Sequence, residues 1–520
     1  MSEAGQIGTS SGTVSYGHTS LLVARQVQLP VLVAVILGSA YMAATLIGFL
    51  VTADPRLLLV CAAVGPVLIL LAPQLFQRSY DLLAPLHFIA LSAMFGVTLR
   101  SLYVVVVDDR TTRELLLQGE PPEFLIPAVL LINAALACLV LGYLAPWPRI
   151  QLYRGRLPRR RGWSDRRVKV VAALLVAVGG ACVALYLDRL DIQLGNLARL
   201  SAKRRLEVTG GEYGYAAMGY CLWGMSLLSY AFYLLWSQLV FSGRRLISLS
   251  GVTTLAVGLL AAFPPFLTSS RTGVMVLVIY AAIIWNYARR PLTARWLTGA
   301  VVAGLLVVTA MAGLRGLGGR MEPGSTSLDA MAVPEAVLGN RNWLGVTKTA
   351  HLMEAVPDEI DYQKGKSFLT WLVAPIPRTV WPEKPVIRVG VTLGEDVFEK
   401  GRRTSGVPPG FIGELYLNFG YLGVFGGMLA LGMVLRMLYA SFWPLLGSNP
   451  SALLLYTVLV FPLTLSLVSN DFSGVVINIA RSLITLGVLL PLVRERATPQ
   501  PTDFGADAEW PGVSKAAADP

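Results

Sequence analysis

Long apolar runs separated by short polar stretches dominate the chain. A bilayer core about 30 Å thick takes ~20 apolar residues of a helix that rises 1.5 Å per residue. About twelve stretches fit this template, at residues 30–51, 57–76, 82–107, 124–145, 168–187, 215–240, 246–268, 273–288, 297–314, 411–437, 452–468 and 474–493. The pattern predicts an all-α fold, a polytopic integral membrane helical bundle with about 12 transmembrane helices.

Composition supports this prediction, because 54% hydrophobic and 14% charged residues give the chain more apolar surface than a soluble fold of 520 residues buries. The four cysteines all fall in apolar stretches, without a CxxC pair, which argues against a disulfide framework and a zinc site. The run that starts at Pro30 is longer than a signal-peptide core, so we expect a retained first span.

The net charge of +12 does not indicate nucleic-acid binding, because the basic residues lie mostly in short segments between apolar runs. Residues 147–169 carry nine Arg and Lys against the single Asp165. Such loops stay cytoplasmic, which predicts that both termini are cytoplasmic. The expected organisation is a polar cytoplasmic tail (1–29), the first part of the membrane bundle (30–314), a large external loop over the bundle mouth (315–410), the last spans (411–494) and a disordered cytoplasmic tail (495–520).

A proline-rich stretch in that external loop, APIPRTVWPEKP at residues 374–385, is the first candidate for a binding site. Its four prolines stiffen the backbone and leave Arg378, Trp381, Glu383 and Lys384 projecting from a preset path. The alternative is a structural crossover whose arginine meets lipid headgroups.

The next candidate is the start of a membrane helix, PPGFIGELYLNFGYLG at residues 408–423. Spacings of four and three place Glu414, Asn418 and Tyr421 on one helix face. A carboxylate near the start of a membrane helix usually marks function. The alternative is that Glu414 complements the positive helix N-terminus.

Basic residues at two outer loops suggest an anionic ligand. Arg271, in the hinge TSSRTG at 268–273, suits bidentate phosphate binding or headgroup anchoring. Arg204 and Arg205 lie in the outer loop 188–214, where the positive-inside tendency does not predict them. His351 is a candidate base or an idle surface histidine.

Acidic residues at the outer turns are weaker candidates. Asp108 and Asp109 could chelate a divalent ion, but adjacent acids at a membrane exit are commonly solvated. Asp471 lies in a short outer turn, where this residue type is ordinary.

The combination of SSRTG at an outer hinge, PRTVWPEKP in a late outer loop and PPGFIGELYLNFGYLG running into a span resembles the O-antigen polymerase family. The resemblance covers roughly residues 268–274 and 340–425. It implies a transferase, independent of metal and cofactor, in the bacterial plasma membrane. Such an enzyme moves a growing glycan from undecaprenyl diphosphate onto the next lipid-linked repeat unit, with a chain-length regulator and a flippase as partners. By position, the resemblance assigns catalysis to Arg271, Arg378 and Glu414.

The residues fit that chemistry independently. Preorganised arginines stabilise the charge that develops on a departing diphosphate, and an acceptor hydroxyl needs a positioned base. Trp381 and Tyr416 offer surfaces for sugar rings or act as interfacial anchors. The expected substrate-binding residues are Lys384, Arg204, Arg205, Asn418, Tyr416, Trp381 and His351.

Three other functions stay open. Another polyprenyl-dependent glycosyltransferase would typically show an acidic pair in the first outer loop, where this chain has only Asp54. A glycan ligase would use the same donor and differ only in its acceptor. A transporter or flippase would show paired halves and charged midplane sites, whereas here a long loop interrupts the spans and charge is expected to avoid the midplane.

Overall fold

The computed structural model describes residues 16–76, 81, 83–107, 117, 119–145, 162–189, 214–267, 270–290, 292, 299, 338, 343–376, 380–381, 383–397 and 407–495. Within these ranges the chain forms helices and no β-strand, apart from one isolated bridge between Trp163 and Arg494. The prediction of an all-α fold is confirmed.

Eight helical segments of the described chain are long and apolar enough to cross a membrane. They are α1 (Tyr16–Thr52), α3–η2–α4 (Pro85–Ala93, Met94–Leu99, Arg100–Val107), η3–α5 (Pro122–Leu125, Ile126–Leu144), α6 (Asp165–Arg189), α8 (Gly214–Phe241), α16–η7 (Gly410–Phe442, Trp443–Leu445), α17–η8–α18 (Pro450–Phe461, Pro462–Ser466, Leu467–Ser469) and α19 (Phe472–Val493).

Three shorter apolar helices complete the membrane-like part of the described chain: α2 (Pro55–Leu71), which η1 (Ala72–Phe76) extends, α9 (Leu249–Leu267) and α10 (Arg271–Ala288). Every span expected from the sequence therefore has a helix in its place, except the one at 297–314, which lies almost wholly outside the described residues.

Local sequence explains where several helices begin. The Asp54 carboxylate accepts a hydrogen bond from the Arg56 amide at 2.9 Å and so caps α2, which starts with proline. Asn449 caps α17 in the same way, ahead of Pro450. Such side chains satisfy amides that lack a partner in the first turn, and proline is tolerated there.

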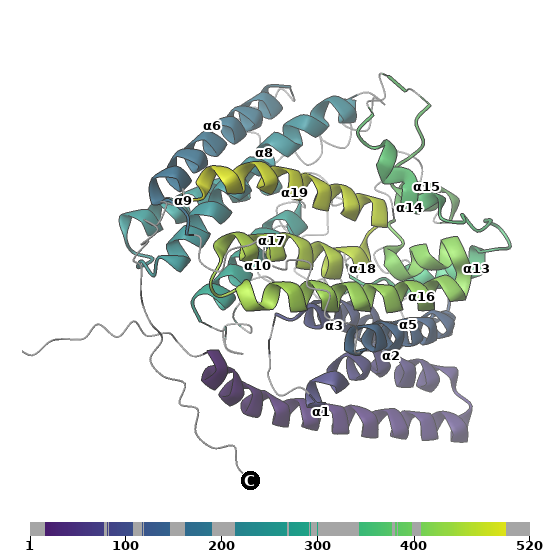
Figure 1. The fold of residues 1–520 in the computed structure, drawn as a ribbon. Coiled ribbons are helices and arrows are strands. Elements are labelled where there is room, and N and C mark those ends of the chain that lie inside the picture. The colour runs from purple at the N-terminus through teal and green to yellow at the C-terminus, as the bar shows by residue number, and fades with distance from the viewer. Residues whose placement is uncertain are drawn as a thin grey trace, which may run out of the picture.

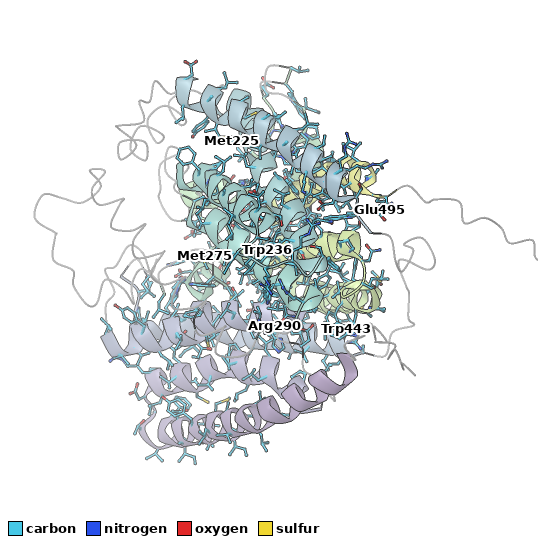
Figure 2. The ribbon with its side chains drawn as sticks, turned by 90° about the vertical axis from the view of Figure 1, so that its left-hand side faces the viewer. Met225, Trp236, Met275, Arg290, Trp443 and Glu495 are labelled. Carbon is cyan, nitrogen blue, oxygen red and sulfur yellow. The ribbon has the colours of Figure 1, made fainter. Side chains whose placement is uncertain are left out.

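The helices pack into two adjoining cores. One core joins α2, α3, α5, α13 (Val346–Ala355) and most of α16, and the other joins α6, α8, α10, α17 and α19. In Figure 2, Trp236 lies near the middle of the molecule, with Met225 on the side of α6. Helix α1 lies at the edge, against α2, and in its most apolar stretch no residue is buried (Figure 1).

The segments expected to be cytoplasmic meet at one end of the bundle. Asp165 pairs with Arg244 at 3.0 Å, Arg289 donates to the Arg244 carbonyl at 3.2 Å, and Arg167 donates to the Arg494 carbonyl at 2.8 Å. These contacts join the start of α6 to the ends of α8, α10 and α19, as expected if the loops share one side of a membrane.

The opposite end carries the described part of the expected external loop. It contains α13, α14 (Lys366–Leu369), η6 (Thr370–Val373) and α15 (Val389–Asp396), which gather beside the start of α16 (Figure 1). This segment is folded, as its aromatic and apolar content predicts.

Helices α5 and α16 cross closely at two glycines. A Cβ on Gly142 would collide with the Leu429 carbonyl, and one on Gly432 would collide with the Leu139 carbonyl. Small residues at such crossings let two backbones approach each other in a membrane. This crossing fixes the second half of α16, beyond Gly420, against α5.

Candidate functional site

Glu414 lies in the first turns of α16 and is fully buried. One carboxylate oxygen accepts a hydrogen bond from the Ser367 hydroxyl and the other from the Phe472 amide, both at 2.7 Å. The carboxylate therefore ties α14 and the first residue of α19 to α16.

Asn418, one turn further along α16, completes this contact. Its Nδ2 donates to the Ser367 hydroxyl oxygen and to the Glu414 carbonyl, both at 2.7 Å, while its Oδ1 accepts from the Gly365 amide at 2.8 Å. Glu414 and Asn418 act on one face, as their spacing predicts. Tyr421 departs from that face because the non-helical backbone at Gly420 (φ 62°, ψ −152°) interrupts the helix, and its side chain is 51% exposed.

Ser367 connects the buried carboxylate to a groove of about 330 Å³ at this end of the bundle. The groove is lined by Asp361, Tyr362, Gln363, Lys366, Ser367, Thr370, Val386, Val389 and Thr392. Hydroxyl, amide, carboxylate and ammonium groups around one hollow can hydrogen-bond a sugar or a phosphate.

Asp471, at the turn between α18 and α19, is a second buried carboxylate near the same end. Burial raises the pKa of Asp471, whereas the positive charges of Arg388 and Lys348 and the amide of Gly390 lower it in part. The Lys348 ammonium is itself buried and donates to the Ser469 carbonyl at 3.2 Å. Sequence reasoning treated Asp471 as an ordinary turn residue and missed Lys348, Arg388 and Ser367.

The other predicted binding residues occupy different surroundings. The buried Lys384 ammonium donates to the carbonyls of Ala374 at 3.0 Å and Ile376 at 2.7 Å, so it closes the proline-rich stretch on itself. Trp381 is 38% exposed, and the buried Tyr416 ring packs against Tyr421 with their ring centres 5.3 Å apart.

His351 is buried on α13 rather than exposed. Its ring lies 4.8 Å from that of Phe124, and its Nδ1 lies 3.8 Å from a Glu354 carboxylate oxygen. The structure thus places His351 against η3, just before α5, and it is not one of the residues that line the groove.

The predicted cationic residues Arg204, Arg205 and Arg378, and the side chain of Arg271, lie outside what the structure describes, as do Asp108 and Asp109. A diphosphate clamp of Arg271 and Arg378 therefore stays a prediction. Among the described residues, no group of three or more His, Cys, Asp and Glu side chains could hold a metal ion.

One expectation from the sequence was wrong. Charge does not avoid the middle of the spans, because Arg481 is the tenth of the 22 residues of α19. Its side chain lines a cavity of about 470 Å³ between α8, α9, α10, η8 and α19. A hydropathy count of α19 tolerates a single arginine among so many apolar residues, which is why the pattern hid it.

The model of a protein family described as "Domain of unknown function (DUF8712)" matches residues 346–497. The match runs from α13 to the end of α19 and so contains Ser367, Glu414, Asp471 and Arg481. No curated protein and no solved structure matches the chain.

Proposed function

We propose that the chain is a glycan polymerase of the bacterial plasma membrane, with about twelve spans and both termini in the cytoplasm. It transfers a polyprenyl-diphosphate-linked oligosaccharide to the next lipid-linked repeat unit on the outer face of the membrane. The observation that carries the proposal is the hydrogen-bonded path from buried Glu414 through Ser367 to a polar groove, at the end of the bundle opposite the basic loops.

In this proposal Ser367 relays a proton. The acceptor hydroxyl gives its proton to the Ser367 oxygen while the serine proton passes to Glu414, and the acceptor oxygen forms the new bond to the sugar carbon. The bond between that carbon and the diphosphate breaks, and its electron pair leaves with the diphosphate. A positioned base of this kind contributes on the order of 10² to 10⁴ in rate.

Asn418 and the Phe472 amide hold the relay in place, since they fix Ser367 and the second carboxylate oxygen. Arg271 and Arg378 remain the candidates for stabilising the departing diphosphate, because guanidinium groups bind phosphate oxygens bidentately. Tyr362, Gln363 and Asp361, which line the groove, would bind the acceptor sugar.

The test is a reconstituted reaction. The full-length protein in lipid nanodiscs, given one synthetic undecaprenyl-diphosphate-linked repeat unit, should produce a ladder of longer glycans in EDTA. Glu414→Gln and Ser367→Ala should each slow chain growth about 100-fold or more. Glu359→Gln, an exposed carboxylate change at the same end, serves as the matched control and should leave the ladder intact.

The same assay separates the alternatives. Transfer to a different acceptor, with no ladder, would identify a glycan ligase, and activity that magnesium restores after EDTA would identify another polyprenyl-dependent glycosyltransferase. Arg481 favours a second candidate, a flippase, because a charge near the middle of a span is typical of transporters. Movement of labelled lipid-linked glycan across vesicles without a new glycosidic bond would overturn polymerisation.

A further inference from the structure

The cavity beside Arg481 is separate from the groove and lies within the membrane part of the bundle. Helices α8, α9, α10 and α19 and the π-helical turn η8 line this cavity of about 470 Å³, which is open on one side. Its polar lining consists of Ser226, Ser229, Ser270, Ser466, Asn478, Arg481 and Ser482, with the Tyr230, Tyr233 and Tyr280 rings beside them.

Arg481 is exposed at this cavity, and among the described residues no negative charge there matches its own. Nine residues of α19 precede it, which places it roughly 13 Å along the helix. None of the residues that line the cavity is an Asp or Glu, and the described part of the chain contains no ion pair to Arg481. Charges at such depth normally face a partner or a water-filled cavity and mark the path of a ligand. An anionic ligand would supply the counter-charge.

The orientation of α19 points the arginine toward the groove end. The Cα–Cβ bonds of a helix tilt toward its N-terminus, and α19 begins beside Phe472, where the amide binds Glu414. Asn478 stands one turn nearer that end. Ser270, which caps α10 through the Gly273 amide at 3.1 Å, lines the same cavity.

The rest of the wall suits hydrocarbon. Leu222, Trp223, Met225, Val276 and Phe461 supply apolar surface. Two prolines in α9 and the π-helical turn at Pro462–Ser466 interrupt regular helix packing beside the cavity. Such π-helical turns often accompany functional sites. A ligand that fits both the polar lining near Arg481 and this apolar surface has an anionic head and an apolar body.

We propose that this cavity binds the phosphate or diphosphate group of a membrane lipid, with Arg481 as its charged ligand and Asn478, Ser466 and Ser482 as hydrogen-bonding groups. The proposal goes beyond glycan transfer and does not depend on it. A polyprenyl phosphate and a phospholipid with a free phosphate share this chemistry.

Native mass spectrometry of the full-length protein can measure lipid binding at this cavity. Undecaprenyl phosphate, phosphatidate or phosphatidylcholine is added in turn, with inorganic pyrophosphate as a competitor. Phosphate lipids should bind at least tenfold more tightly than phosphatidylcholine. Arg481→Gln should abolish that preference, because charge-assisted hydrogen bonds to phosphate are about twice as strong as neutral ones. Ser229→Leu, which fills the cavity without changing charge, should weaken binding as well.

The matched control is Arg436→Gln, since Arg436 also lies in a span but sits 5.6 Å from the Tyr143 ring. It should bind lipid as the unchanged protein does, and so should Glu414→Gln, which separates this site from glycan transfer. Tightest binding of undecaprenyl phosphate would identify the carrier lipid as the source, and equal binding of phosphatidate a general lipid phosphate. Excess pyrophosphate should displace the phosphate lipids from the unchanged protein. Equal loss in Arg436→Gln, or no preference over phosphatidylcholine, would overturn the proposal.

Discussion

Glu414 shows how one buried side chain can organise the site. Its carboxylate has no exposed surface. It accepts hydrogen bonds from the Ser367 hydroxyl in α14 and from the Phe472 amide at the start of α19. A buried acceptor keeps such donors satisfied, and removing it leaves both donors without an acceptor. Its structural role and its proposed chemical role therefore have to be separated by experiment.

We expect Glu414→Ala to lower the free energy of unfolding by about 1–3 kcal/mol, because the Ser367 hydroxyl and the Phe472 amide lose their acceptor in a buried place. Thermal unfolding in detergent measures the change, and Glu359→Ala is the matched control. An unchanged midpoint would show that water or a neighbouring group replaces the carboxylate.

Asp471 predicts a dependence of stability on pH. Since burial raises its pKa above the ordinary 3.8, the folded protein holds this proton to a higher pH than the unfolded chain does. The stability contribution is complete below the unfolded pKa and is lost as pH rises through the folded one.

As pH rises from 4 to 8, the thermal unfolding midpoint of the unchanged protein should therefore fall relative to the midpoint of Asp471→Asn. A difference that widens in favour of the unchanged protein as pH rises would mean that Arg388 and Lys348 outweigh burial.

Sequence could predict only the local half of this site. Glu414 and Asn418 were found because they lie four apart on one helix. Ser367 lies 47 residues before its partner Glu414, and Lys348 lies 121 residues before its partner Ser469. No spacing rule relates positions so far apart in the chain. Arg481 could have been found by asking which spans carry a charge near their middle.

Among the helices, hydropathy was the reliable signal, and local backbone geometry was the weak one. Apolar length located the spans, because lipid demands it. The helix break at Gly420 in α16 and the π-helical turns η2 and η8 were not predicted. They arise from packing against other helices, and a single sequence does not show which helices will be in contact. Close crossings such as that of α5 and α16 are equally non-local.

That crossing gives a sharp substitution test. In Gly432→Ala the new Cβ would meet the Leu139 carbonyl and the Tyr143 amide, so we expect destabilisation by about 1–3 kcal/mol. Gly426→Ala on the same helix is the control, since its Cβ would meet nothing within 4 Å and alanine favours helix. Equal unfolding midpoints for the two variants would contradict the close approach.

In the described part of the chain, the basic segments meet at one end of the bundle and the groove lies at the other. Which end faces the cytoplasm is the remaining prediction. A cysteine at Asp358, exposed on the groove end, should react with an impermeant thiol reagent in intact cells, whereas one at Ile247, 93% exposed on the basic end, should not.

Reaction at Ile247 alone would invert the orientation and place the groove in the cytoplasm. The unchanged protein is the control, because its four cysteines are buried or partly buried.

The peripheral place of α1 bears on biosynthesis. Its main contacts are with α2. The α2 side chains Leu68 and Leu57 pack against Gly38 and Gly48 of α1, respectively. The Cys61 thiol of α2 donates to the Met42 carbonyl of α1 at 3.5 Å. These two helices follow each other directly along the chain. They can therefore leave the ribosome and enter the bilayer as one hairpin, ahead of the helices that follow α2 along the chain.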